Sequence, residues 1–191
     1  MKYNPEIHHR KSMRLKHYDY AEMGAYFVTI CTHDRVCLFG EVVDREMVLN
    51  AAGEMVKNYW MDIAKRFEGV ERDEFIVMPN HFHGILFLVG ADRCVCPDMV
   101  DEQNPKTGRH IGLPLPTIIQ WFKTMTTNEY IRNVKHANWP AFCGRLWQRN
   151  YYEHIIRDES ELNRIREYVI NNPVAWDKDE ENPAVTNNVG L

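Results

Sequence analysis

Two histidines, His81 and His83, stand one residue apart in an otherwise apolar stretch, IVMPNHFHGILFL (residues 76–88). The stretch has the composition of a strand, in which successive side chains point to opposite faces. Both imidazoles would then project from one face, about 7 Å apart, beside the turn Pro79-Asn80. Such a pair could bind one divalent metal ion. The spacing fits equally two structural histidines that are hydrogen-bonded at the end of a strand.

A tyrosine and an asparagine form a second candidate cluster in NRIREYVINNP (163–173). Tyr168 and Asn172 are four residues apart, which places them on one face of a helix. Tyr168 would lie at the edge of the apolar stripe of this helix, turned toward the protein. Packing alone would explain such a tyrosine. The amide oxygen of Asn172, one turn further on, could complete a metal site with the two histidines.

The elements that must position these residues follow from hydrophobic periodicity and from turn residues. In order, we expect a strand over 25–33, a turn and short connection over 34–43, a helix over 45–67, a hairpin of strands 73–78 and 81–89, a helix over 117–134, a strand over 146–157 and a helix over 161–172, with capping residues at 158–160. This order predicts an α+β fold, a ferredoxin-like antiparallel sheet with helices packed on one face.

The chain of 191 residues has the length of one domain. We expect a basic N-terminal leader over 1–20, a single folded domain over 21–176 and a polar C-terminal tail over 177–191. Within the domain, residues 90–114 form a loop that is longer than a structural connection needs. Such a loop is either functional or partly disordered.

The net charge of −4 conceals a segregation of charge along the chain. Residues 1–20 carry a charge of +3 and residues 105–157 carry +6, whereas residues 158–191 carry −5. A mildly acidic protein can therefore present a basic face to a polyanion. An ordinary solvated surface would show the same pattern.

Membrane and disulfide-rich classes are not indicated. No apolar run approaches the length of a membrane helix, and the polar N-terminus does not have the apolar core of a signal peptide. The five cysteines do not have the spacing of a zinc ribbon. Cys94 and Cys96 could bind a soft metal, but no second pair completes such a site. Reduced thiols in a cytoplasmic protein are the simpler interpretation.

Several segments together resemble one known family. They are MPNHFHG (78–84), WQRNYYEHIIRDE (147–159), REYVINNPV (166–174) and the leader RKSMRLKHYDY (10–20), which runs into AYFVTICTH (25–33). In this order they resemble the HUH-type single-tyrosine transposases, and within them the branch of REP-associated tyrosine transposases. The resemblance covers roughly residues 10–176.

The resemblance implies a metal-dependent endonuclease and strand transferase that acts on single-stranded hairpin DNA of REP-like repeats. His81 and His83 would bind Mg²⁺ or Mn²⁺, and Tyr168 would be the nucleophile that forms a 5′-phosphotyrosine. Asn172 would be the third ligand, where relatives carry glutamine or another polar residue. The enzyme would act as a monomer or a homodimer, and the leader would help to select the DNA.

Single-stranded DNA is bound by cationic groups for the phosphates and by aromatic faces for the bases. The expected DNA contacts are Arg10, Lys11, Arg14 and Lys16 in the leader, and Lys123, Arg145 and Arg149 in the later basic segment.

Other roles stay open at this point. Tyr151 and Tyr152, on the strand expected over 146–157, are rival nucleophiles, and His154 beside them fits packing or support of the site. A non-catalytic protein that binds structured DNA or RNA is the second hypothesis for the whole chain. A metal phosphohydrolase of small molecules, which would activate water in place of Tyr168, is the third.

Overall fold

The computed structural model describes residues 23–89 and 114–186. The leader with Arg10, Lys11, Arg14 and Lys16, nearly all of the loop over 90–114 and the last five residues lie outside the described residues. The elements are, in chain order, β1 (Gly24–Cys31), η1 (His33–Arg35), β2 (Gly40–Val43), β3 (Glu46–Leu49), α1 (Ala51–Met61), α2 (Ile63–Arg66), β4 (Val70–Val77), β5 (His81–Leu88), α3 (Leu115–His136), β6 (Tyr152–Ile156), α4 (Glu159–Ile170), α5 (Asn172–Ala175), η2 (Trp176–Lys178) and α6 (Pro183–Thr186).

The main sheet has the strand order β4-β5-β1-β6, and each neighbouring pair is antiparallel. The hairpin partner β5 lies between β1 and β4, which are the two strands joined through α1. This is the split βαβ arrangement of ferredoxin-like folds. The predicted α+β fold with an antiparallel sheet and packed helices is therefore confirmed.

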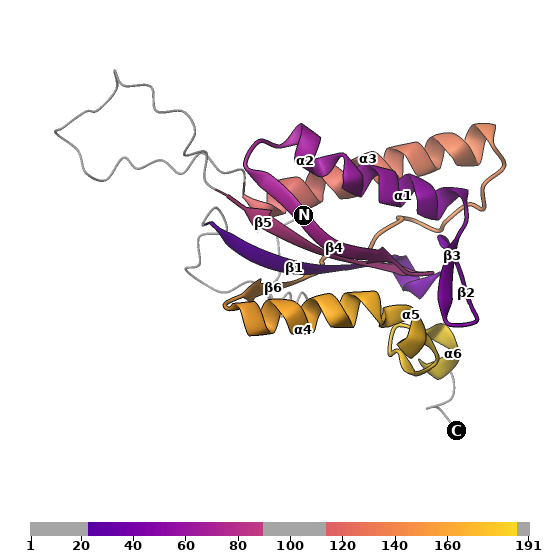
Figure 1. Cartoon of the computed structure of the whole chain (residues 1–191). Coiled ribbons are helices and arrows are strands. Elements are labelled where there is room, and N and C mark those ends of the chain that lie inside the picture. The colour runs from indigo at the N-terminus through magenta and orange to yellow at the C-terminus, as the bar shows by residue number, and fades with distance from the viewer. Residues whose placement is uncertain (1–22, 90–113, 187–191) are drawn as a thin grey trace, which may run out of the picture.

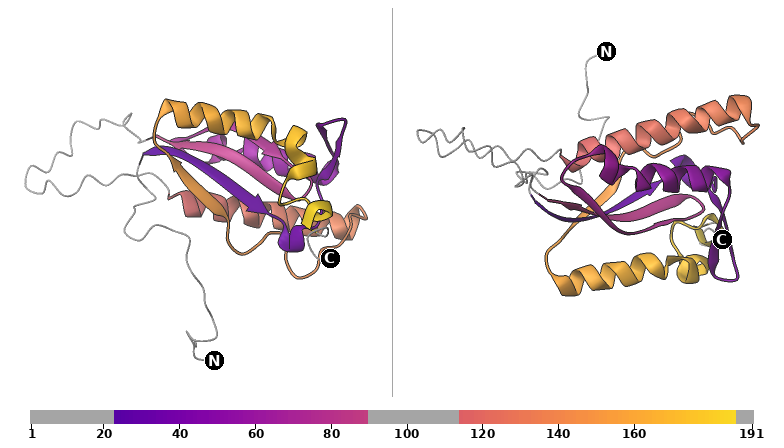
Figure 2. Two further views of the ribbon diagram at one scale, coloured as in Figure 1. Left: turned by 90° about the horizontal axis from the view of Figure 1, so that it is seen from below. Right: turned by 45° about the horizontal axis from the view of Figure 1, so that its top comes forward.

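The helices cover both faces of the sheet, and in this respect the expected packing on one face needs correction. Figure 1 shows α1 and α3 on one side of the sheet and α4 on the other, and Figure 2 shows the same layers from two further directions. The reason is that β1 and β5 are apolar on both faces. Tyr26 and Phe82 face the large core under α1 and α3, whereas Phe27 and Ile85 face α4.

The large core is built around the indole ring of Trp60, which α1 places over the middle of the sheet. Trp60 is fully buried, and its ring centroid lies 4.4 Å from that of Phe82 and 5.4 Å from that of Phe122 on α3. The smaller core under α4 consists of five buried residues, Phe27, Ile85, Ile156, Leu162 and Val169. These two unequal cores hold the sheet between three helices.

Two local predictions differ from the structure. The helix expected from residue 45 begins at Ala51, because the side chain of Asn50 caps it by accepting hydrogen bonds from the backbone N–H groups of Ala52 and Gly53. Residues before this cap form the hairpin β2–β3, which was expected to be a turn and the first turn of the helix. The last strand is shorter than 146–157, since β6 begins at Tyr152.

Helix α4 begins two residues before the expected start at 161, with Asp158 as its N-cap residue. The carboxylate of Asp158 accepts a hydrogen bond from the backbone N–H of Glu161. Helix α4 crosses the sheet to the edge strand β4, where Arg166 donates to the carboxylate of Asp73 at 2.8 Å. Among the described helices, none is long and apolar enough to cross a membrane.

Candidate active site

The first two side chains of β5 that face α4 are His81 and His83. Both are almost completely buried, and their ring centroids lie 4.6 Å apart. They lie on one face of the strand, as the alternation of side chains predicted. Burial lowers the pKa of His81 to about 4. Burial, and then the neighbouring His81, hold the pKa of His83 well below its ordinary value, so both rings are neutral at pH 7.

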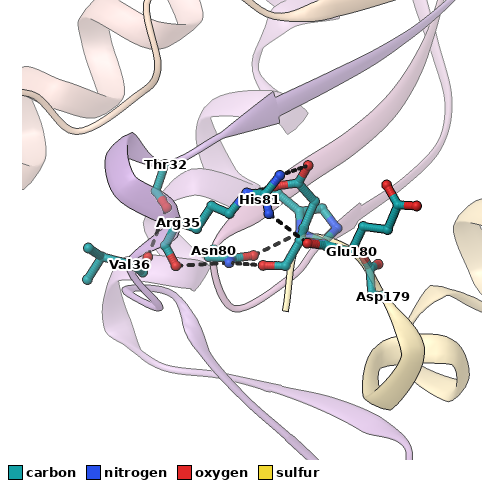
Figure 3. Close-up of polar contacts among 8 residues, drawn as sticks. Thr32, Arg35, Val36, Asn80, His81, Asp179 and Glu180 are labelled. Atoms are coloured by element: carbon teal, nitrogen blue, oxygen red, sulfur yellow. Dashed lines mark hydrogen bonds and ion pairs between the residues drawn. The ribbon is translucent and has the colours of Figure 1, made fainter. Parts of the chain in front are cut away.

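Each histidine is anchored through its Nδ1 atom. Nδ1 of His83 lies 2.8 Å from the hydroxyl of Thr29 on β1, and Nδ1 of His81 lies 2.9 Å from Oδ1 of Asn80. The amide of Asn80 is oriented by its Nδ2, which donates to the carbonyls of Arg35 at 3.0 Å and Glu181 at 2.7 Å (Figure 3). Oδ1 of Asn80 therefore accepts, so Nδ1 of His81 carries the proton and Nε2 carries a lone pair.

The end of α4 brings the tyrosine and the asparagine to the two free ring nitrogens. The hydroxyl of Tyr168 lies 3.3 Å from Nε2 of His83, and Oδ1 of Asn172 lies 3.3 Å from Nε2 of His81. Tyr168 is 49% exposed as a residue, whereas Asn172 is buried. The structure thus brings together all four residues that the sequence singled out.

The aromatic ring of Phe27 supports this arrangement from β1. It stacks on His83 with ring centroids 5.4 Å apart and meets Tyr168 edge to face at 6.0 Å. Partial burial, and next the negative charge of Asp179, raise the pKa of Tyr168 above its ordinary value. Tyr168 alone is therefore a poor nucleophile at neutral pH, and a cation at the site would be needed to favour its ionised form.

Metal binding can be tested against the donor atoms of the site. In the part of the chain that the structure describes, no three His, Cys, Asp or Glu side chains come together to hold a metal ion. The donor set here is instead two imidazoles and one amide oxygen. The lone pair of His81 Nε2 faces Asn172 Oδ1, a second acceptor, and Nδ2 of Asn172 is buried without a hydrogen-bond partner among the described residues.

A cation bound to both atoms would resolve this meeting of two acceptors, and so would a rotation of the Asn172 amide that turns Nδ2 toward His81. Two ligands bound to one ion at about 2.1 Å each lie roughly 3.0–3.4 Å apart, which is compatible with the observed 3.3 Å. Nδ1 anchors of the kind given by Thr29 and Asn80 are usual around metal-binding histidines. The residues present therefore fit a divalent cation such as Mg²⁺ or Mn²⁺.

The rival residues of the last strand lie apart from these nitrogens. Tyr152 shares the α4 face and meets Phe27 edge to face at 6.3 Å, but no hydrogen bond joins it to either histidine among the described residues. Tyr151 packs against the large core on the opposite face. His154 lies 2.9 Å from the carboxylate of Glu161, which gives it a structural role.

The three predicted cationic contacts within the described residues gather away from the histidines. Lys123, Arg145 and Arg149 line one pocket between α3 and residues 145–153. Lys123 donates to the carbonyls of Gln148 at 2.7 Å and Arg149 at 3.2 Å. Trp147, in the same segment, is a core residue whose ring N–H donates to Thr126.

Sequence reasoning missed the residues that anchor the site. Asn80 was interpreted as a turn residue, although a polar residue directly before His81 was a usable signal. Thr29 and Phe27 gave no signal, because only the pairing of β1 with β5 brings Thr29 beside His83. Trp176, whose ring centroid lies 5.9 Å from that of His81, was also unforeseen.

Comparisons with known proteins agree with this fold. No family model matches the chain. An uncharacterized protein of Haemophilus influenzae is 41% identical over 182 residues, which cover 94% of this chain and 96% of that protein. A solved REP-associated tyrosine transposase, bound to a REP hairpin, is similar in structure with a TM-score of 0.53 and 16% identity, over 86% of this chain and 73% of that one. The chain belongs to the same family as the Haemophilus influenzae protein, and its fold is that of the REP-associated tyrosine transposases.

Proposed function

We propose that this protein is a metal-dependent endonuclease and strand transferase for single-stranded DNA next to hairpin repeats, with Tyr168 as its nucleophile. The observation that carries the proposal is the position of the hydroxyl of Tyr168, a half-exposed residue, 3.3 Å from Nε2 of the buried His83 and beside the His81–Asn172 pair. The proposed nucleophile on α4 and the two proposed metal ligands on β5 are thus held close together by separate elements.

The likeness to the transposase supports the choice of DNA as substrate. That protein is described in complex with a REP hairpin. The cationic pocket at α3 and the basic segment that lines it supply groups that suit a DNA backbone.

The reaction would begin with attack of the Tyr168 oxygen on a phosphorus atom of the DNA strand. An O–P bond forms to the tyrosine, the bond from phosphorus to the 3′ oxygen breaks, and the phenolic proton leaves through the exposed side of the ring to water. The leaving 3′ oxygen takes a proton from water, and the products are a 5′-phosphotyrosine and a free 3′-OH. A second 3′-OH could reverse the step and join two strands, since the phosphoryl bond energy is kept.

The chain's residues would also supply the electrostatic help that phosphodiesters require. When bound to His81, His83 and Oδ1 of Asn172, Mg²⁺ or Mn²⁺ would polarise the phosphate and stabilise the leaving oxygen. Phe27 orients His83 and Tyr168 by ring contacts, and Asn80 and Thr29 fix the two imidazoles so that the Nε2 atoms face the substrate.

The test is covalent capture of DNA. Wild type, Tyr168→Phe and the matched control Tyr152→Phe are incubated with Mn²⁺ and labelled DNA hairpins that carry single-stranded flanks of random sequence. We expect a protein-linked DNA band on a denaturing gel for wild type and Tyr152→Phe and none for Tyr168→Phe, which should still bind the hairpin. A band that follows Tyr152 would overturn the assignment, and strand cleavage unaffected by Tyr168→Phe would indicate attack by water.

A second candidate is a non-catalytic protein that binds structured DNA or RNA. The observation in its favour is the third donor, the neutral amide of Asn172, with no further carboxylate, histidine or cysteine close enough in the described residues to form a set of three. Hairpin binding without any covalent band, in Mg²⁺ and in Mn²⁺, would support this candidate.

A further inference from the structure

A pocket beside α3 is lined by polar and charged side chains. It has a volume of about 730 Å³ and lies between α3 and residues 145–153. We call it the α3 pocket, and the residues that matter for its chemistry are Lys123, Thr124, Asn128, Arg145, Arg149 and Glu153. Its volume is in the range of pockets that bind small organic groups.

Two arginine side chains line the pocket. Arg145 and Arg149 line the α3 pocket and also a second hollow, whose other charged or titratable lining residues are His33, Asp34 and Arg35. Neither side chain has a hydrogen-bond or ion-pair partner among residues 23–89 and 114–186. Arg132, by contrast, is paired with Glu129 at 2.7 Å. Guanidinium groups left without a carboxylate suit phosphate oxygens.

The interior carries groups that suit a nucleobase more than a second phosphate. Thr124 and Asn128 project from α3 with donors and acceptors, and the carboxylate of Glu153 lies on the opposite wall. Base edges present the same mixture of amino, ring-nitrogen and carbonyl groups. A carboxylate would repel a phosphate but accept from an exocyclic amino group.

Lys123 contributes to the wall of the pocket. Its ammonium group ties α3 to the carbonyls of Gln148 and Arg149, so the backbone that carries Arg149 is held in place. Burial, and next the charge of Arg145, lower the pKa of Lys123 to about 8.

The pocket is linked to the candidate active site through the end of β1. The carbonyl of Cys31 accepts a hydrogen bond from the N–H of Gln148 at 2.9 Å, and on its other side Cys31 pairs with His81. Gln148 therefore lies two strand spacings, about 10 Å, from the backbone of His81. A few nucleotides of a single strand would bridge this distance.

We propose that the α3 pocket binds one unpaired nucleotide of the DNA, with its base inside the pocket and its phosphates on Arg145 and Arg149. This inference rests on the proposed function. It adds to it a second position, separate from the cleavage site, at which the enzyme recognises a base of the strand. A base inside the pocket cannot also be stacked in a duplex. The part of the substrate that fits is therefore a nucleotide in a single-stranded flank of the hairpin.

The test combines a protein variant whose α3 pocket is filled by a large side chain with DNA strands that each lack one base. A hairpin is first selected for binding to wild type from a library with random single-stranded flanks. Its dissociation constant is then measured by fluorescence anisotropy for the intact DNA and for a series with one abasic site at each flank position. The variants are Thr124→Trp, which fills the pocket from an exposed helix position, and the control Ile131→Trp, which is exposed on the same helix but does not line the pocket.

We expect one abasic position to weaken binding to wild type by about 5–100-fold, the usual effect of losing one bound base. Thr124→Trp should bind the intact DNA more weakly by a similar factor and lose nothing more at that position, because the two changes remove one interaction. Ile131→Trp should behave like wild type. Thermal melts that match wild type show that the variants fold.

Two results would overturn the inference. If the losses from Thr124→Trp and from each abasic site are additive, or if Thr124→Trp binds like wild type, no base lies in the pocket. Should wild type still form the Tyr168 adduct in that case, the proposed function stands without the pocket. A wild-type protein that selects no hairpin from the library overturns both.

Discussion

The chemistry proposed for Tyr168 depends on groups that orient the two imidazoles rather than on the tyrosine alone. Burial raises the pKa of its hydroxyl, so the proposed reaction requires a cation at His81 and His83 that favours the ionised form. Both Nε2 atoms face the site because Thr29 and Asn80 take the Nδ1 atoms. Removing such an anchor should change metal affinity while the ligands themselves remain.

Thr29→Val tests this at the scale of one residue. Valine has the shape of threonine without the hydroxyl, so His83 loses the partner of its Nδ1. We expect the dissociation constant for Mn²⁺, measured by isothermal titration calorimetry, to rise by about 10–100-fold, as for other outer partners of metal-binding histidines. Thr127→Val, a substitution on α3 far from the site, is the control. An unchanged Mn²⁺ affinity in Thr29→Val would contradict the anchoring role.

The sequence indicated the four candidate side chains of the site more clearly than the residues that support them. The alternation of a strand was enough to place His81 and His83 on one face, and the period of a helix was enough to pair Tyr168 with Asn172. Their convergence 3.3 Å apart follows from the packing of α4 on the sheet, which no local pattern records. Thr29 is 54 residues from His83, so its role depends on strand pairing.

At the scale of elements, the absence of a side chain at Gly84 allows helix α1 to pack closely against strand β5. It lies three residues after His81 on β5 and faces α1, where an added Cβ would overlap the ring of Trp60 and approach Cε1 of Phe82 to 2.8 Å. We expect Gly84→Ala to lower the free energy of unfolding by about 1–3 kcal/mol, the usual cost of overpacking a core.

Urea denaturation followed by tryptophan fluorescence measures this loss. Gly24→Ala is the matched control, because a Cβ at Gly24 would meet only the ring of Tyr26 at an ordinary 3.7 Å or more. Equal midpoints for the two variants would show that α1 can move away from β5 at little cost.

The contact between α3 and residues 148–149 should depend on pH through Lys123. Its pKa is about 8 in the folded protein against an ordinary 10.5, so between these values the unfolded chain holds a proton that the folded chain has lost. Stability from this group therefore rises with pH across that window. We expect the unfolding free energy of wild type, relative to Lys123→Met, to increase from pH 8 to pH 10. A constant difference would mean that Lys123 keeps its ordinary pKa.

The elements that sequence analysis placed wrongly had weak local signals. The turn between β2 and β3 uses Asp44 and Arg45 with positive φ, without the glycine that marks most such turns. Met47 and Ala51 have helical spacing, although Met47 belongs to β3. The capping side chain of Asn50 was the signal that could have separated strand from helix.

For the molecule as a whole, a net charge of −4 is compatible with DNA binding because the cations of residues 105–157 are concentrated. If Arg145 and Arg149 each bind a phosphate, replacement of either by glutamine should reduce the slope of log affinity against log salt by about 0.7, the value for single strands. Arg132→Gln is the control, since Arg132 is paired with Glu129. Slopes equal to wild type in both pocket variants would show that neither arginine binds a phosphate.

The arrangement of layers was the largest feature that the sequence did not decide. The apolar residues on both sides of β1 and β5 show that each face needs a cover, but they do not tell which helix covers which face. Tyr26 and Phe27, next to each other in the chain, pack under different helices. The order of elements predicted the sheet, and its two apolar faces required a helix on each side.

The unequal size of the two cores determines which part of the candidate site separates first on heating. Helix α4 is held by five buried apolar residues and by the Arg166–Asp73 ion pair, while the strand with both histidines belongs to the large core around Trp60. Segments with fewer buried contacts open at lower free energy than the whole domain unfolds. Mild heating would therefore separate Tyr168 from His83 while the sheet is still folded, and the proposed activity would be lost before the fold.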